Sequence, residues 1–214
     1  MHSKAISDAV WRLLLGLSGL ESMQSGYLAG GTGLAMQLGH RVSEDLDFFF
    51  SEQPDYHDVL TELSTMSVNA IVMSQTPGHC ELMINRIKVD LIRERIPLRF
   101  FRKTFVVEHM KLRLADPRDI GRQKLFAIGS RGSKKDFMDL YCLTRSVLPL
   151  EDLLALVVEE QGTVRFNRLL FLKGLIDFEE ADRDPPPVLL WDLSWERVKS
   201  DLTAEVKRLA MKWS

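Results

Sequence analysis

Apolar residues in the first half of the chain recur either every three to four positions or in short runs, and the two patterns predict different elements. Helical spacing covers residues 4–21, 32–38 and 56–66, with Asp55 as the expected N-cap of the third helix. Short apolar or alternating runs predict strands. The predicted strands are residues 27–30, 46–50, 69–75, 80–92 and 104–114.

A hairpin is predicted between the third and fourth of these strands. Pro77 and Gly78 supply its turn. The alternation of the fourth strand slips once near Asn85 and Arg86, which predicts a bulge or bend at that point.

The pattern changes after Pro117, and the rest of the chain is predicted to be helical. The predicted helices are residues 117–130, 134–146, 150–161, 164–180 and 194–213. Three prolines at 185–187 form a stiff linker before the last helix. We therefore expect an α+β fold, with a short mixed sheet in a core of residues 1–115 and a helical region of residues 116–214 that completes a cleft against it.

Composition narrows the class of protein. The chain has 214 residues, of which 28 are Lys or Arg and 30 are Asp or Glu, so its formal net charge is −2. This charge excludes a generally basic nucleic-acid coat but is compatible with a local basic face. Cys80 and Cys142 lack the spacing of a zinc site or a disulfide framework, and we expect buried thiols in a reducing compartment. No apolar run approaches the ~18 residues of a membrane span, so we expect a cytoplasmic protein without a membrane partner.

Three acidic residues coincide with predicted strands. Asp45 and Asp47 lie two residues apart at the start of a strand, so both side chains project from one face. Asp90 is a polar residue in the apolar run KVDLI. Such carboxylates suit Mg²⁺, which prefers oxygen ligands and leaves positions open for substrate phosphates. Alternatively, the first two acids are simply solvated and Asp90 is a buried acid paired with Lys88 or Arg86.

A glycine-rich turn precedes these acids. Gly30, Gly31, Thr32 and Gly33 lie between an apolar strand and a helix, where backbone N–H groups can bind an anion and Thr32 can add a hydroxyl donor. The spacing fits neither of the common glycine-rich phosphate-binding motifs. On its own the turn is a weak indication, because a plain tight turn has the same composition.

The segment YLAGGTGLAMQLGHRVSEDLDFFF resembles the signature of the nucleotidyltransferase AbiEii/AbiGii toxin family, within the polymerase β-like nucleotidyltransferase superfamily. The superfamily pattern is a G-[GS] turn that opens a helix, then [DE]-x-[DE], then a third acid on a later strand. A second segment, DIGRQKLFAIGSRGSKKDFMDLY, resembles the family's lysine-bearing helix followed by an arginine and a K/R-D-x-x-D helix. Two departures are that Thr32 replaces the usual serine and that twelve residues separate it from Asp45.

The resemblance implies a polymerase β-like core and assigns roles to individual residues. Asp45, Asp47 and Asp90 would bind Mg²⁺, or Mn²⁺ in its place, and Asp90 would help to deprotonate the attacking hydroxyl. Lys124, which could otherwise be a surface lysine, would contact the triphosphate of an NTP.

Further residues are implicated in phosphate binding. Gly30, Gly31 and Thr32 would cradle the phosphates, and Arg131 matches the family's arginine. Arg41 would either bind phosphate or pair with Asp45.

Two more acids lie one helical turn apart on a shared helix face, Asp136 and Asp139. They would join the site, orient Lys124, or pair with Arg131 and Lys135. We prefer Asp136 as the catalytic residue of the two.

The implied activity is transfer of NMP from an NTP to an acceptor hydroxyl. The resemblance suggests RNA, in particular the 3′ end of tRNA, as the acceptor, and a cognate antitoxin as a partner. A basic cluster would line the RNA path unless it is an ordinary solvated face: Arg86, Lys88, Arg93, Arg95, Arg99, Arg102 and Lys103. The alternatives are an enzyme that modifies (AMPylates) protein side chains and a non-catalytic nucleotide-binding module.

Overall fold

The computed structural model describes residues 1–107, 109–161 and 168–213. A short 3-10 helix, Ser3–Ala5, precedes the first α-helix. The remaining elements, in chain order, are α1 (Asp8–Gly19), β1 (Tyr27–Leu28), α2 (Gly30–Leu38), β2 (Leu46–Phe50), α3 (Tyr56–Thr65), β3 (Ala70–Thr76), β4 (His79–Ile84), β5 (Ile87–Arg93), β6 (Lys103–Val107), β7 (Met110–Leu114), α4 (Pro117–Arg131), α5 (Lys134–Ser146), α6 (Leu150–Gln161), α7 (Arg168–Gly174), α8 (Glu179–Arg183) and α9 (Trp195–Trp213).

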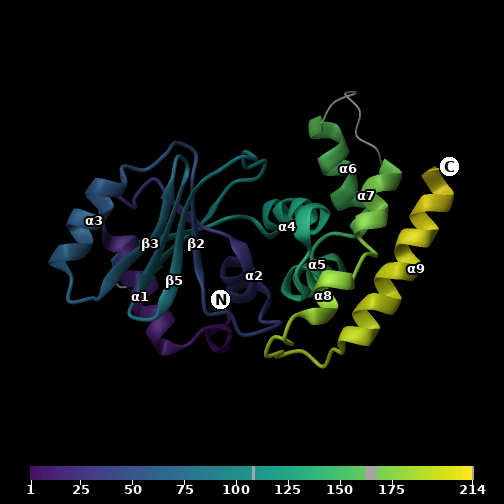
Figure 1. Cartoon of the computed structure of the whole chain (residues 1–214), viewed down its shortest axis with the longest axis horizontal. Coiled ribbons are helices and arrows are strands. Elements are labelled where there is room, and N and C mark those ends of the chain that lie inside the picture. Colours follow the sequence, from purple (N-terminus) through teal and green to yellow (C-terminus); the bar gives the residue numbers. More distant parts are fainter. Residues whose placement is uncertain (108, 162–167, 214) are drawn as a thin grey trace.

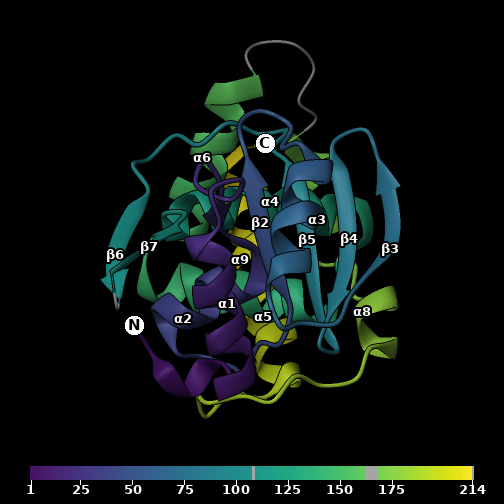
Figure 2. The ribbon, with the colours of Figure 1, turned by 90° about the vertical axis from the view of Figure 1, so that its left-hand side faces the viewer.

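One mixed sheet occupies the first half of the chain. Its seven strands lie in the order β3-β4-β5-β2-β1-β7-β6. β2 is parallel to β5 and β1 is parallel to β7, whereas the other neighbours are antiparallel. Helices α1 and α3 cover one face, and the helices from α4 onwards lie beyond the other (Figures 1 and 2). This arrangement confirms the α+β fold class with C-terminal helices.

The alternation of strand β2 determines what faces the C-terminal helices. Leu46, Phe48 and Phe50 are buried in the core beneath α1 and α3. Asp47 and Phe49 are only partly buried and point to the other face. The C-terminal helices are held together by a second apolar core. β2 therefore presents a carboxylate to the space between the sheet and those helices. The predicted boundary at residue 115 falls between β7 and α4, and a division into two domains there stays a prediction.

Two predicted strands are hairpins in the structure. The run 80–92 is divided by a turn at Asn85 and Arg86, whose φ angles of 52° and 68° suit a two-residue hairpin turn. The slip in the alternation thus marked a turn, and the expected bulge or bend was wrong. The run 104–114 also folds back on itself as β6 and β7, with His109 at a φ of 75°.

Helix boundaries differ from the predictions where local capping decides them. α1 begins at Asp8 rather than at residue 4, because the Ser7 side chain accepts a hydrogen bond from the N–H of Val10. The predicted helix 164–180 lies partly outside the described residues. From residue 168 it is two helices, since α7 ends at Gly174 and α8 begins only at Glu179.

The segment after the prolines 185–187 connects the two halves of the chain. Val42 N–H donates to Val188 O (2.8 Å), and Leu190 N–H donates to His40 O (2.9 Å). This short antiparallel contact fixes the loop before β2 against the C-terminal half. Cys80 and Cys142 are buried free thiols, as expected. Within the described residues, no helix is both long and apolar enough to cross a membrane.

Candidate active site

The parallel pairing of β2 and β5 brings two of the predicted acids together. Asp47 and Asp90 are direct register partners on these adjacent strands, so their side chains lie next to each other on one face of the sheet. Burial and the neighbouring Asp90 carboxylate raise the pKa of Asp47 to about 6. Lys124 and Lys88 lower the pKa of Asp47, but burial and Asp90 raise it by more.

Asp90 also has basic neighbours on the sheet. Its carboxylate lies 2.7 Å from His79 Nε2 and 3.3 Å from Lys88 Nζ. The pairing with Lys88 was one of the two interpretations from the sequence. The contact with His79 was missed, because β4 and β5 were predicted as one strand and their antiparallel register was therefore not foreseen.

The three acids do not converge as expected. Asp45 lies just before β2 and is exposed to solvent. Among the residues that the structure describes, no group of three or more His, Cys, Asp or Glu side chains is placed to hold a metal ion. Of the three acids, only Asp47 and Asp90 are register partners, and the three-acid metal centre stays a prediction.

The glycine turn packs directly on the acid pair. Gly30 has a φ of +57°, and a Cβ at this position would collide with Asp47 Oδ2. A Cβ on Gly31 would collide with Arg41 Nη2. Thr32 is buried, its hydroxyl donates to the Asp45 carbonyl oxygen, and it lies 2.8 Å from Ser43 Oγ. The Thr32 hydroxyl thus braces the loop before β2 rather than opening to a ligand, which corrects its predicted role as a phosphate donor.

Arg41 is not paired with Asp45, one of its two predicted partners. It is buried, and its Nε and Nη2 donate to the two carboxylate oxygens of Asp139 at 2.6 and 3.0 Å. Asp139 also lies 2.8 Å from His40 Nε2 and 2.8 Å from Lys124 Nζ. Burial alone would raise the pKa of Asp139, but Lys124 and Arg41 hold it well below its usual range. Asp139 is a fully buried anchor for the loop before β2.

Lys124 connects this anchor to the open site. Its Nζ lies 2.7 Å from Asp136 Oδ1, and Asp136 also accepts hydrogen bonds from the Ser133 hydroxyl and, in a capping box at the start of α5, from the Ser133 backbone N–H. Burial would lower the pKa of Lys124, but the carboxylates of Asp139 and Asp136 outweigh it and raise the pKa above its ordinary value. Lys124 therefore stays charged. The side chain of Arg131, at the end of α4, lies outside the described residues.

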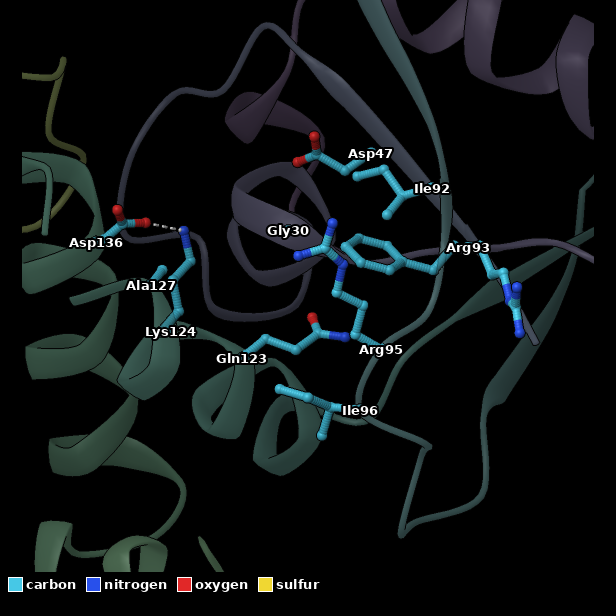
Figure 3. Close-up of a pocket in the computed structure, with 11 residues that line it drawn as sticks. Gly30, Asp47, Ile92, Arg93, Arg95, Ile96, Gln123, Lys124, Ala127 and Asp136 are labelled. Carbon is cyan, nitrogen blue, oxygen red and sulfur yellow. Dashed lines mark hydrogen bonds and ion pairs between the residues drawn. The ribbon is translucent and has the colours of Figure 1, made fainter. Parts of the chain in front are cut away.

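A cavity of about 530 Å³ separates the acid pair from α4. Its walls bring together two strands, α2, α4 and α5, and are formed by Gly30, Asp47, Phe49, Ile92, Arg93, Arg95, Ile96, Gln123, Lys124, Ala127 and Asp136. Figure 3 shows Asp47 and Lys124 on opposite sides of the cavity, with Arg95 reaching into it and Arg93 pointing away. Arg95 was predicted only as part of a surface cluster, and Gln123 was missed.

The donor set fits a divalent cation that a substrate helps to bind. Mg²⁺ is usually held by one or two carboxylates together with substrate phosphates and waters. Asp47 and Asp90 supply the two carboxylates, and the raised pKa of Asp47 reflects its burial and its repulsion by Asp90. Asp45 lies close enough to add to that repulsion.

The sequence of the whole chain identifies the family. Residues 12–212 match the family described as "Nucleotidyl transferase AbiEii toxin, Type IV TA system". The chain belongs to this family. It is therefore a nucleotidyltransferase of the AbiEii toxin class, and membership implies an NTP substrate, a divalent metal ion and a toxin–antitoxin context.

Individual relatives agree with the AbiEii assignment. The "uncharacterized protein aq_aa25" of Aquifex aeolicus (strain VF5) is 32% identical over 186 residues, which cover 85% of this chain and 86% of the relative. JHP933 from Helicobacter pylori shares the fold, with a TM-score of 0.56 at 18% identity over 96% of this chain and 90% of that one. MenT4, the nucleotidyltransferase toxin Rv2826c from Mycobacterium tuberculosis H37Rv, does so with a TM-score of 0.56 at 17% identity over 93% and 83% of the two chains.

Proposed function

We propose that this protein transfers a nucleoside monophosphate from an NTP to a hydroxyl of RNA, with tRNA as the principal acceptor, and that a cognate antitoxin restrains it. The observation that carries the proposal is the in-register pair of Asp47 and Asp90, of which Asp47 faces Lys124 across the cavity. Opposite charges on the two walls suit a ligand that carries both phosphates and a divalent cation.

The phosphates have three sources of positive potential. Lys124 stays charged between its acids, and Arg95 extends into the cavity without an ion-pair partner among the described residues. The N-terminus of α2 begins at Gly30 beside Asp47 and has no side-chain cap, so its N–H groups are available to an anion. These groups would hold the triphosphate against the acid pair.

The acid pair would carry the chemistry. A bound Mg²⁺ or Mn²⁺ would neutralise the triphosphate and lower the pKa of the attacking hydroxyl. The acceptor oxygen forms a bond to the α-phosphorus, the bond to the pyrophosphate oxygen breaks, and the hydroxyl proton passes to a carboxylate of the pair. Asp90, held by His79 and Lys88, is the residue we assign to that proton.

The proposal is tested by locating transferred label. Purified protein is incubated with each α-labelled NTP, Mg²⁺ and either total tRNA or a cell lysate. We expect label on tRNA, and Asp47→Asn should lower the rate by at least a hundredfold because the variant loses a charge needed at the reacting centre. Asp58→Asn, an exposed acid on α3, is the matched control.

The alternatives give different results. Label on protein with none on RNA would replace the proposal by a protein-modifying activity. Equal rates for the wild type and Asp47→Asn would contradict the assigned site, and bound but untransferred NTP would indicate a binding module.

A further inference from the structure

The face of the sheet that borders the cavity carries two rows of different chemistry. One row is the acid pair, Asp47 and Asp90. The next row on the same face, two residues further along each strand, is Phe49 and Ile92, which are also register partners. The register thus places an apolar platform about 7 Å from the acids, given the strand rise of about 3.3 Å per residue.

The platform is held from the side, by the neighbouring strand β1. Phe49 stacks on Tyr27, with ring centroids 6.0 Å apart and planes 23° from parallel. The Tyr27 hydroxyl donates to Glu94 Oε2 at 2.5 Å. Because this hydrogen bond fixes Tyr27, and Tyr27 stacks on Phe49, the Phe49 ring offers a rigid surface to the cavity.

The opposite wall of the cavity, formed by α4, also has a charged part and an uncharged part. On α4, Lys124 faces the acids, whereas Gln123 and Ala127 lie one turn apart and also line the cavity. Gln123 Oε1 is buried and has no hydrogen-bond partner among the described residues. A buried amide oxygen without a donor costs about 1–3 kcal/mol, so this atom is suited to accept a hydrogen bond from a ligand.

We propose that this end of the cavity, formed by Phe49, Ile92, Ile96, Gln123 and Ala127, binds a nucleobase, and that Gln123 selects among bases. The inference rests on the proposed function, because it takes the ligand to be a nucleotide. A base has a π face that stacks on an aromatic ring and an edge that carries N–H donors. The apolar platform of Phe49 and Ile92 matches the π face, and the unpaired Gln123 oxygen matches the N–H donors. Arg95 and Lys124 would then hold the phosphates at the other end of the cavity, beside the acids.

The base has two possible sources, the NTP or the end of the acceptor RNA. The first arm of the test measures the Kd values of ATP, GTP, CTP and UTP by calorimetry with Mg²⁺, for the wild type and for Gln123→Leu. The second arm measures transfer to RNAs that differ only in their terminal base. Gln53→Leu, in the exposed loop after β2, is the matched control.

If the site holds the NTP base, the wild type has different Kd values for the four NTPs. Gln123→Leu then raises the Kd of the preferred NTP by about ten- to a hundredfold, so that the four Kd values become similar. If the site holds the acceptor base, the Kd values for the NTPs stay unchanged, and only the difference in transfer rate among the acceptor RNAs becomes smaller. Uniform weakening of all four NTPs, or unchanged preferences in both arms, would overturn the inference.

A second variant covers the case in which Gln123→Leu does not fold. Gln123→Glu keeps the size and the accepting oxygens but loses the amide donors, so it should retain binding of the preferred base and alter the order of the others. Base-selective NTP binding without any transfer to RNA would refute the proposed acceptor and leave the nucleobase site standing.

Discussion

Asp47→Asn should stabilise the metal-free protein, although it should abolish transfer. In the folded chain, burial and Asp90 raise the pKa of Asp47 to about 6. The unfolded value is about 3.9. A shift of roughly two pKa units corresponds to about 3 kcal/mol by which the ionised carboxylate destabilises the fold.

The pH dependence follows from the sign of this shift. The folded state binds a proton more tightly than the unfolded state, so the destabilisation is absent below pH ~4, grows between pH 4 and 6, and is constant above pH 6. The variant has no charge at this position. Its free energy of unfolding should therefore exceed that of the wild type by up to about 3 kcal/mol at pH 7.5 and by almost nothing at pH 4.

Urea unfolding in EDTA, followed by circular dichroism at pH 4, 5, 6 and 7.5, measures this difference. Asp58→Asn, whose side chain is exposed, should show no such pH-dependent gain. A difference between Asp47→Asn and the wild type that does not change with pH, or a variant that is less stable at pH 7.5, would refute the electrostatic argument.

Two other substitutions test the opposite wall. Lys124→Ala removes the cation that Asp136 and Asp139 share. Asp139 keeps Arg41, but Asp136 then has no cationic partner among the described residues, so the free energy of unfolding at pH 7 should fall by about 3 kcal/mol in urea titrations. Because both pKa values are lowered in the fold, this loss should shrink progressively as the pH falls below about 4, and a deficit of unchanged size there would contradict the ion-pair origin. Arg95→Ala should raise the KM for NTP by about tenfold without changing the melting temperature, whereas Arg93→Ala, whose side chain points away from the cavity, should change neither quantity in steady-state transfer assays.

The local sequence determined the elements wherever a single signal controls the backbone. Helical spacing predicted α4 and α5 within a residue, and Asp55 caps α3 as expected. The hairpin of β4 and β5 was missed because the slip in the alternation at Asn85 and Arg86 was interpreted as a bulge or bend, whereas their positive φ angles form a two-residue turn.

The family motifs in the sequence also indicated which residues carry the chemistry. It identified Asp47, Asp90 and Lys124 as site residues, and the structure places Asp47 and Lys124 on the walls of one cavity with Asp90 beside Asp47. What each side chain contacts was decided by tertiary packing. Arg41 is paired with Asp139, a residue 98 positions away, and no local pattern encodes such a contact.

The apolar half of the cavity also could not be predicted from the local sequence. Phe49 and Ile92 become neighbours because β2 and β5 pair in parallel with a particular register. Gln123 lines the same cavity because α4 packs on α2 and α5, which hold it opposite the sheet. The register of such a strand pair is set by the burial of one whole face of the sheet. A shift by one residue would turn every side chain of the strand to the other face. The sequence therefore determined the chemistry that is present, and the tertiary structure decided which groups share a cavity.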